Sequence, residues 1–452
     1  MQSRGALENH HKSTKGMVII MKDLDKLTES VTEKLGERGA QLSHCSATVR
    51  ETKEFNVDGG EFSLLRTLFD NSLSVTAVKD GKKGSVGLNN FSDEAVEQAV
   101  CDCLAAAEAS QSDDAWGLCP DALHESFTEG SLVPDLDKLF FRSRELLETV
   151  KSDYPLIVIE QMIISHEASH TVYRNSNGTH FTKDSGLYSV SIMFSAHEGE
   201  ITSSFFSSGV ITDSLEAPFI SLGSIRRDLA DVQKQLHTVT PKEKFTGTMV
   251  LTPACLGEFA DCICSNFAGD GVILDNTSIW KDKLGQQVAD ERLTVSFAPS
   301  TQGIVCGQSF TAEGFVAEDF DFIKNGRLES FLIGLYVANK TGNRRAKNNC
   351  AGMVISAGDK SIEDIISGID RGILVGRFSG GDPGTNGDFS GVAKNSFLIE
   401  NGRITDALSE TMISGNLADM LNNLRQLSAE RVYDGTSILP YAAFDGITVS
   451  GK

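Results

Sequence analysis

The sequence predicts an α+β protein with two parts: an N-terminal α/β two-layer domain with an antiparallel sheet, and a C-terminal strand-rich barrel or sandwich domain with a few helices. Two observations support this prediction. Helical spacings and alternating apolar stretches both occur in the first half, whereas short strands and turns dominate from residue 293 onward. The chain has 452 residues, 40% hydrophobic and 23% charged, which is a globular composition long enough for two or three domains.

The first residues carry no periodic pattern. Residues 1–20 are expected to form a disordered leader, because the segment before Met17 is polar and lacks the apolar run of a signal peptide. Met17 and Met21 both fit a natural start. No apolar run reaches the ~20 residues that a membrane span requires. We therefore expect a cytoplasmic protein without membrane contact.

Residues 21–240 are expected to form the N-terminal domain. Helical spacing predicts helices over 24–35, 92–107, 135–151 and 225–236. Alternation and apolar runs predict strands over 46–55, 72–79, 154–164, 188–194 and 201–206. Asn-Ser-Asn-Gly at 175–178 predicts a hairpin turn, and residues 110–135 are expected to form a loop.

Residues 241–452 are expected to form the C-terminal domain, after a short polar connection. A strand is predicted over 247–251 and a helix over 254–267. Short strands then alternate with hairpin turns, including two with the letters NGR, at 324–327 and 400–403. One further helix is predicted over 361–368.

The charge balance argues against a nucleic-acid partner. The net charge is −21, and an acidic surface repels a phosphate backbone. The one dense basic cluster, Arg344, Arg345 and Lys347, is more typical of local ion pairing in a loop than of a DNA contact.

Nine scattered cysteines without a CxxC pair indicate reduced thiols in a reducing compartment. The pairs Cys101–Cys103 and Cys262–Cys264 lie in predicted helices, where residues i and i+2 point to different sides. We interpret both pairs as structural.

His166-Glu167-Ala168-Ser169-His170 matches HExxH, the zinc-peptidase signature. That chemistry requires a helix, on which both histidines reach one zinc at about 2 Å. Apolar, β-branched residues on both sides predict a strand instead, which would separate the two histidines by about 13 Å. We interpret the match as fortuitous.

The second half offers little catalytic chemistry of its own. All nine histidines lie at or before His237, so residues 238–452 cannot build a histidine-ligated zinc site. The glycine-rich stretch 380–388 lacks the GK[ST] of a phosphate-binding loop. We interpret it as a wide loop or hairpin end, with a backbone-lined binding surface as the alternative.

Several segments occur in an order that resembles the TldD/PmbA family, and most closely its PmbA (TldE) branch. They are GTMVLTP at 247–253, NTS at 276–278, TAEG at 311–314, TGNRR at 341–345, GG at 380–381, GDFSG at 387–391, FLIENGRIT at 397–405 and ISGN at 413–416. The NSNG turn at 175–178 matches as well. The resemblance covers most of the chain from about residue 24.

The resemblance implies a lost zinc site. TldD-type members of the family carry HExxxH on the helix after the first strand of the C-terminal domain. With Gly269-Asp270 as anchor, that motif falls on residues 260–265, where Ala260 and Ser265 replace the histidines and Asp261 replaces the glutamate. The cysteine ligand near the C-terminus of TldD-type members is also absent, at 434–437. We therefore expect no catalytic residue and no cofactor in this chain.

The resemblance also implies a partner. PmbA-type members pair with a TldD-type subunit, which holds the zinc, and the pair acts in proteolysis and peptide processing. We expect a heterodimer with such a subunit, or a homodimer in isolation, that holds an extended peptide by strand addition. The candidate peptide-binding residues are Asn343, Arg344, Gly380 and Gly381.

Two alternatives stay open. The chain could be an active peptidase in which Cys262 or Cys264 shares a zinc with His166 or His170 across an interface. It could also be a non-proteolytic binding protein that modulates DNA gyrase, a role attached to the family by an older label.

Overall fold

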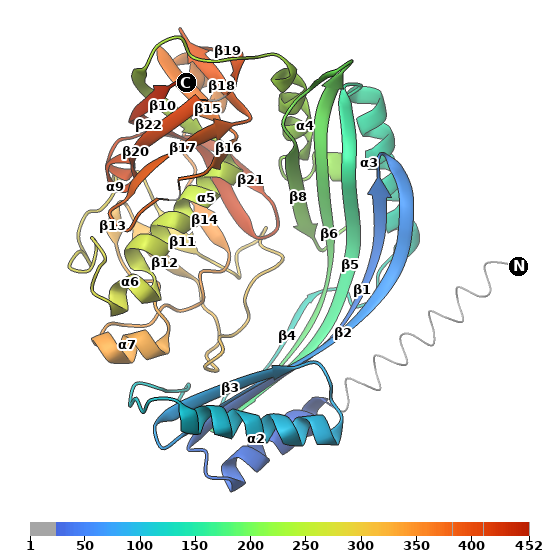
Figure 1. Ribbon diagram of the computed structural model, residues 1–452, viewed down its shortest axis with the longest axis vertical. Helices are drawn as coiled ribbons and strands as arrows, with labels where there is room; N and C mark the ends of the chain where they lie inside the picture. The colour runs from blue at the N-terminus through green and yellow to red at the C-terminus, as the bar shows by residue number, and fades with distance from the viewer. Residues whose placement is uncertain (1–23, 382, 410, 452) are drawn as a thin grey trace, which may run out of the picture.

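The computed structural model describes residues 24–381, 383–409 and 411–451, and Figure 1 shows two sheet-based halves side by side. The predicted leader, Met17 and Met21 lie outside the described residues. The first half is a curved sheet of very long strands, and the second half is a compact, strand-rich body with short helices. The predicted α+β class is confirmed.

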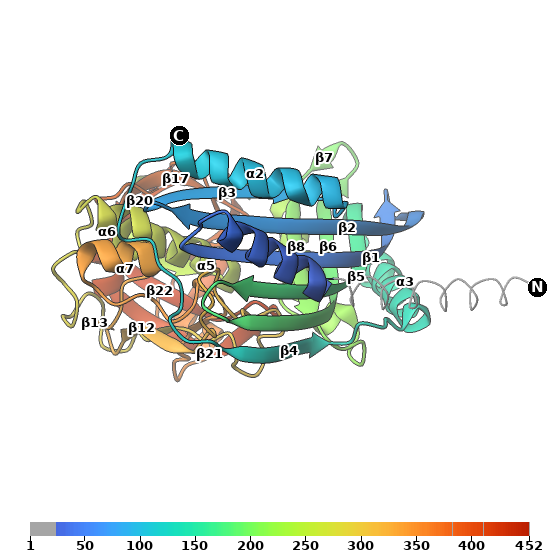
Figure 2. The same ribbon diagram turned by 90° about the horizontal axis from the view of Figure 1, so that it is seen from below.

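The first sheet has the strand order β3-β2-β1-β5-β6-β4, with β7 and β8 also paired to β6. Its members are β1 (Leu42–Asp58), β2 (Glu61–Lys79), β3 (Lys82–Leu88), β4 (His124–Gly130), β5 (Ile157–Asn175), β6 (His180–Glu198), β7 (Ile201–Thr202) and β8 (Phe206–Thr212). Neighbours are antiparallel except β4 and β6. The long strands curve, so that their lower ends pass beneath the second half (Figures 1 and 2).

Helices cover the first sheet in two groups. A helix over residues 24–37 and α2 (Asp93–Ala109) pack on one end, and Ser92 caps α2 by accepting from the backbone N–H of Ala95. The other end is covered by α3 (Leu136–Asp153), η1 (Phe219–Ser221), α4 (Ile225–Gln233) and η2 (Lys234–Leu236). Figure 2 shows α2 lying along β3.

The second half contains a sheet of the order β13-β12-β11-β14-β22-β10-β15-β18-β19-β9. Its members on this path are β9 (Thr238–Val239), β10 (Phe245–Leu251), β11 (Val295–Phe297), β12 (Phe320–Lys324), β13 (Arg327–Leu328), β14 (Met353–Ile355), β15 (Arg371–Val375), β18 (Ser396–Glu400), β19 (Arg403–Leu408) and β22 (Ser437–Ser450). Off this path lie β16 (Arg377–Ser379), β17 (Asp388–Lys394), β20 (Thr411–Asn416) and β21 (Leu424–Tyr433).

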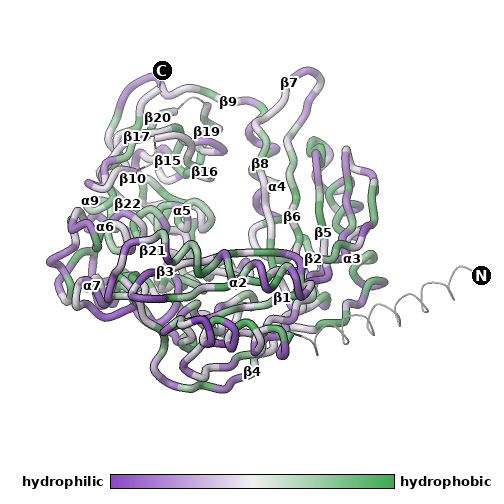
Figure 3. Tube along the Cα trace, turned by 60° about the horizontal axis from the view of Figure 1, so that its bottom comes forward, coloured by the Kyte–Doolittle hydropathy of each residue, from purple (hydrophilic) through white to green (hydrophobic). Residues whose placement is uncertain are grey.

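One helical run crosses the core of the second half. It consists of α5 (Pro253–Ile263), the π-helical turn η3 (Cys264–Ala268) and α6 (Asp270–Leu274), and α5 is largely hydrophobic (Figure 3). The remaining helices are α7 (Leu335–Thr341), α8 (Ile362–Ser367) and α9 (Leu417–Asn422). Buried Phe259, Phe267 and Phe389 belong to the core around this run.

Three sequence predictions are wrong in detail. The predicted loop 110–135 contains β4, whose exposed, polar residues give no alternation signal. The predicted strand 201–206 is divided, because only β7 falls within it and β8 begins at Phe206. The helix at 361–368 is not alone in the strand-rich part, since α7 and α9 have 7 and 6 residues, too few for a periodic pattern.

The two halves share several contacts. Tyr173 donates its hydroxyl hydrogen to the carbonyl of Ala312 (3.0 Å), and the Gln235 amide donates to the carbonyl of Ser396 (2.9 Å). β9 already pairs with β19 of the second sheet, and the domain boundary near residue 240 stays a prediction. In the part of the chain that is described, no helix has the length and apolar character to cross a membrane.

Candidate functional site

The candidate peptidase helix is α5, which follows β10 directly. Thr252 caps it by accepting from the backbone N–H of Cys255 (3.4 Å), and Pro253 occupies its first turn. Leu256, Phe259 and Ile263 lie on its buried face. This apolar spacing fixes which side of the helix points outward.

The three positions that are expected to correspond to the zinc motif of TldD-type members lie along this run. Ala260 is buried in α5, whereas Asp261 and Ser265 are exposed at the end of α5 and in η3. Although Asp261 is exposed as a residue, partial desolvation of its carboxyl group raises its pKa. The pKa of Glu258, one turn earlier, is raised mainly by burial and lowered in part by the nearby Arg377.

Two thiols interact electrostatically with Asp261. Cys264 is fully enclosed, and burial raises its pKa well above the ordinary value of a thiol. Cys350 is exposed as a residue, but desolvation of its thiol raises the pKa to about 12, with added repulsion from Asp261 and Asp270. A zinc ion would have to displace both protons, because thiol ligands bind zinc as thiolates.

These residues do not fit a zinc ion. Ala260 has no donor atom, and Ser265 offers only a neutral hydroxyl. Within the described ranges, no group of three or more His, Cys, Asp or Glu side chains is arranged to hold a metal. In the segment 434–437, where the TldD-type cysteine is expected, the Asp434 carboxylate accepts from the backbone of Thr436 and Ser437 (2.7 and 2.6 Å).

Loops hold the helical run in place. The Asn266 amide donates to the carbonyl of Pro383 (2.9 Å), which ties η3 to the glycine-rich loop. Asp270 accepts from the backbone N–H of Gly334 (2.9 Å), which ties α6 to the start of α7. The glycine-rich loop therefore lies beside the former motif.

The histidines of HEASH lie elsewhere, in β5 of the first sheet, so the predicted strand is confirmed. His166 is buried, with Nε2 2.8 Å from the carbonyl oxygen of Ser131. His170 places Nδ1 2.6 Å from Oδ1 of Asp184. Both imidazoles thus have partners within the first half. The shared zinc with Cys262 or Cys264 has no geometric support in the described residues.

The four candidate peptide-binding residues lie in two separate segments, one after α7 and one in the β16–β17 hairpin. Asn343 follows α7 and donates its side-chain N–H to Oγ1 of Thr341 (3.1 Å). Arg344 is exposed there. Gly380 and Gly381 lie at the end of the β16–β17 hairpin, which confirms the predicted hairpin end. Figure 1 shows α7 well below β16, and peptide binding at these residues stays a prediction.

The neighbouring basic cluster is partly neutralised. Lys347 pairs with Glu318 (2.8 Å), and Arg345 stacks on the ring of Phe315 at 3.5 Å. Among the described residues, Arg344 has no ion pair. This arrangement matches the interpretation of local pairing.

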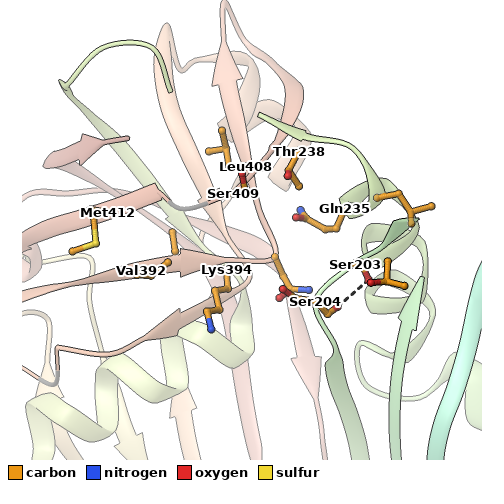
Figure 4. A pocket seen from close by; sticks show the side chains of 13 residues that line it. Ser203, Ser204, Gln235, Thr238, Val392, Lys394, Leu408, Ser409 and Met412 are labelled. Carbon is orange, nitrogen blue, oxygen red and sulfur yellow. Dashed lines mark hydrogen bonds between the residues drawn. The ribbon is translucent and has the colours of Figure 1, made fainter. Parts of the chain in front are cut away.

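A pocket of about 460 Å³ lies between the halves near β9. Figure 4 shows its side chains converging from β17, β19 and β20 on one side and from the segments around β7 and η2 on the other. Its polar members include Ser203, Ser204, Gln235 and Lys394. Asn395 also lines it, and both of its side-chain amide atoms are buried without a hydrogen-bond partner among the described residues. No sequence signal indicates this pocket, because it forms between distant segments.

Comparison with known proteins identifies the fold. A model of the PmbA/TldA metallopeptidase C-terminal domain matches residues 244–451, and a model of domain 1 of the same family matches residues 46–107. The chain belongs to the PmbA/TldD family. Metalloprotease PmbA of Escherichia coli O157:H7 is 24% identical over 415 residues, covering 88% of this chain and 90% of the relative.

Two further comparisons agree with this family. A metalloprotease of Methanocaldococcus jannaschii is 31% identical over 193 residues, which span 40% of this chain and 42% of the relative. The crystal structure of TldE from Thermococcus kodakarensis superimposes with a TM-score of 0.79 at 20% identity, over 94% of this chain and 100% of that one. The PmbA/TldD fold therefore extends over nearly the whole chain.

Proposed function

We propose that this PmbA/TldD chain is the zinc-free subunit of a two-chain metallopeptidase, and that a TldD-type subunit supplies the zinc. The observation that carries the proposal is the donor set at residues 260–265. A catalytic zinc needs three protein ligands to lower the pKa of its bound water toward 7. Ala260 and Ser265 cannot supply such ligands. Without a zinc-bound water at this site, Asp261 has no nucleophile to deprotonate.

The edge of the first sheet supports a partner of the same fold. Residues 61–72 of β2 pair with β1 on one side, and β3 begins to pair only at Leu73. Within the described residues, no strand pairs with the other side of this segment. Such a free edge is a template for another strand.

Side chains along this edge are unusually apolar. The exposed residues are Phe62, Leu64, Leu65, Leu68 and Phe69, with exposed fractions from 36% to 70%. Because successive strand residues face opposite sides, both faces of the segment are apolar. A strand that is apolar on both faces is typical of the interior of a sheet.

The second apolar contribution comes from α3. Phe140 and Phe141 are 40% and 49% exposed, and Phe140 lies against Phe62 at 5.1 Å between ring centroids. Strand β2 and helix α3 thus form one surface, here called the β2–α3 edge. An exposed apolar surface of this kind is typical of an interface with another subunit.

We further infer that the complex holds an extended peptide by main-chain hydrogen bonds, since strand addition supplies affinity with little sequence preference. The alternative that this chain modulates DNA gyrase stays a prediction, and none of the contacts described above favours it. The acidic balance of the chain, −21, disfavours direct contact with DNA but leaves protein contacts open.

The test combines this chain with a TldD-type subunit from the same cell. We expect the pure chain to carry no stoichiometric zinc and to leave unstructured peptides intact, whereas the mixture forms a 1:1 complex that hydrolyses them. Zinc is measured by mass spectrometry of the metal, assembly by light scattering, and cleavage by peptide mass. Hydrolysis by the pure chain with bound zinc would contradict the proposal. A mixture that neither assembles nor cleaves would do the same.

A further inference from the structure

A second pocket, of about 280 Å³, lies where the first sheet meets the loop and helix around α7. Strands β1, β2 and β3 form one wall, and Trp116, Glu313 and Tyr336 belong to the other. Figures 1 and 2 show α7 close to the end of the sheet that carries β3. The pocket is distinct from α5 and from the pocket of Figure 4, and nothing above assigns it a role.

The pocket contains one side chain of each charge. Lys83 and Glu313 are both half-buried, and neither has an ion-pair partner among the described residues. Lys83 instead places its ammonium group 4.4 Å from the centre of the Trp116 ring. Arg345, whose charge interacts with that of Glu313, is itself stacked on Phe315. Half-buried charges that form no ion pair favour a ligand that supplies one.

The aromatic wall is rigidly held. Trp116 and Tyr336 stack with ring centroids 4.0 Å apart. Tyr336 donates its hydroxyl hydrogen to Asp113 (2.9 Å), and Asp113 pairs with Lys340 (2.6 Å). The Trp116 indole N–H is buried and has no acceptor in the part of the chain that is described, although nearly all buried donors in proteins have one. The wall therefore presents a preorganised aromatic surface with one donor to spare.

The remaining lining is neutral and mixed. Burial lowers the pKa of His44 to about 4, with help from the charge of Lys83, so its imidazole is neutral at pH 7. Thr76 and Ser85 share a hydrogen bond of 2.9 Å at the polar side. Leu42, Val78 and Leu118 supply apolar area. Few polar groups among apolar walls is the usual composition of a small-ligand site.

We propose that this pocket binds a small zwitterion, an α-amino acid or a dipeptide with an apolar side chain. Glu313 would accept from the ligand's ammonium group, and Lys83 would donate to its carboxylate. The apolar side chain would lie against Leu42, Val78 or Leu118. A single acid or a single amine satisfies only one of the two charges, and a zwitterion satisfies both. The proposal concerns this chain alone and does not depend on the subunit proposed above.

Calorimetry on the full chain tests the proposal with four probes. They are leucine, alanyl-leucine, N-acetyl-alanyl-leucine and alanyl-leucinamide. Either leucine or alanyl-leucine should bind, and the choice between them reports the spacing of the two charges. Blocking either end of the dipeptide removes one charged contact and should weaken binding by roughly tenfold or more, which corresponds to about 1.4 kcal/mol. No binding by leucine or alanyl-leucine, or equal binding by the blocked peptides, would overturn the proposal.

Paired variants assign each contact. In Lys83→Gln, amidating the ligand should cost nothing further, because the partner of the carboxylate is already gone. In Glu313→Gln, acetylating the ligand should likewise cost nothing further. Matched controls are Lys82→Gln, next along β3, and Glu318→Gln, which pairs with Lys347; both should bind as the unaltered chain does. If amidation still weakens binding to Lys83→Gln, or acetylation still weakens binding to Glu313→Gln, by as much as in the unaltered chain, the assigned contacts are wrong.

Discussion

His170 Nδ1 lies 2.6 Å from Asp184 Oδ1, on residues that face each other directly across β5 and β6. This contact gives the second histidine of HEASH a structural partner in a sheet, far from the helix that corresponds to the peptidase motif. The five residues therefore match the zinc signature in sequence only, because the strand does not bring both histidines to one metal.

A first prediction concerns His166. Its ring is 1% exposed, and Nε2 contacts the carbonyl of Ser131. Replacing it in His166→Ala leaves that carbonyl unpartnered and should lower the free energy of unfolding by about 1–3 kcal/mol. Urea unfolding measures the loss.

The matched control is Glu167→Gln, which removes the glutamate of the same five-residue match. Glu167 is exposed and pairs with Arg50 at 3.0 Å, so the change should cost no more than about 1 kcal/mol. Peptide hydrolysis by the mixed complex should not change. A complete loss of hydrolysis in Glu167→Gln, with the complex intact, would instead support a catalytic role for HEASH.

A second prediction separates the two glycines of the 380–388 loop. Both have left-handed backbone, with φ of +74° and +67°. A Cβ on Gly380 would meet nothing within 4 Å, whereas a Cβ on Gly381 would lie 1.7 Å from the carbonyl oxygen of Ser390. Gly380→Ala should cost about 1–2 kcal/mol. Gly381→Ala should cost a further ~1–3 kcal/mol, because the hairpin must shift.

Denaturant unfolding of the two alanine variants measures this difference. Equal losses would mean that the Ser390 carbonyl moves freely. Affinity for an extended peptide in the mixed complex then tests the binding role. Weakened affinity in Gly380→Ala, with little loss of stability, would support a backbone-lined surface at this loop.

A third prediction concerns the β2–α3 edge. Lysines in the double variant Leu65→Lys, Phe69→Lys should prevent assembly with a TldD-type subunit, since charged edge strands resist pairing. Both side chains are largely exposed, at 64% and 70%, so the isolated chain should stay folded. Light scattering of the mixture and circular dichroism of the single chain measure the two effects.

The matched control is Ile404→Lys, on β19 of the second half. Ile404 is 40% exposed and lies outside the β2–α3 edge. This variant should assemble normally. Loss of assembly in Ile404→Lys with normal assembly of the double variant would move the interface to the second sheet. If the unaltered chain forms a homodimer alone, the same double variant should separate it.

A fourth prediction concerns pH. Burial raises the pKa of Asp228 to about 6, although Ser208 and Ser224 donate to the same oxygen (2.6 Å each). Asp231 raises this pKa slightly and Arg227 lowers it. A carboxyl whose pKa is higher in the folded state stabilises the fold below its unfolded pKa of ~3.9, and this contribution is lost as pH rises through about 6.

Asp228→Asn should therefore remove part of the pH dependence. Relative to the unaltered chain, the variant should gain about 1–2 kcal/mol between pH 5 and pH 8, because the amide keeps an acceptor for the serines without a charge to bury. Urea unfolding at pH 5, 6.5 and 8 measures the gain. A stability difference that is constant over this range would show that Asp228 does not titrate there.

Local sequence patterns predicted much of the fold. Apolar spacing predicted the helices at 24–35, 92–107 and 135–151, because amphipathic periodicity is encoded within one element. The same reasoning correctly assigned HEASH to a strand. Short or polar elements such as β4 and α7 gave no signal, since their positions depend on neighbours that are distant in sequence.

The sequence by itself determined that residues 238–452 contain no histidine and that Ala260 and Ser265 cannot ligate zinc, because ligand chemistry is a property of side-chain type. Only the tertiary structure decided which groups meet. It joined Lys83 and Glu313 in one pocket, left the amide of Asn395 without a partner, and exposed both faces of β2 at a free edge. Contacts of this kind are set by the packing of whole elements, which no local pattern records.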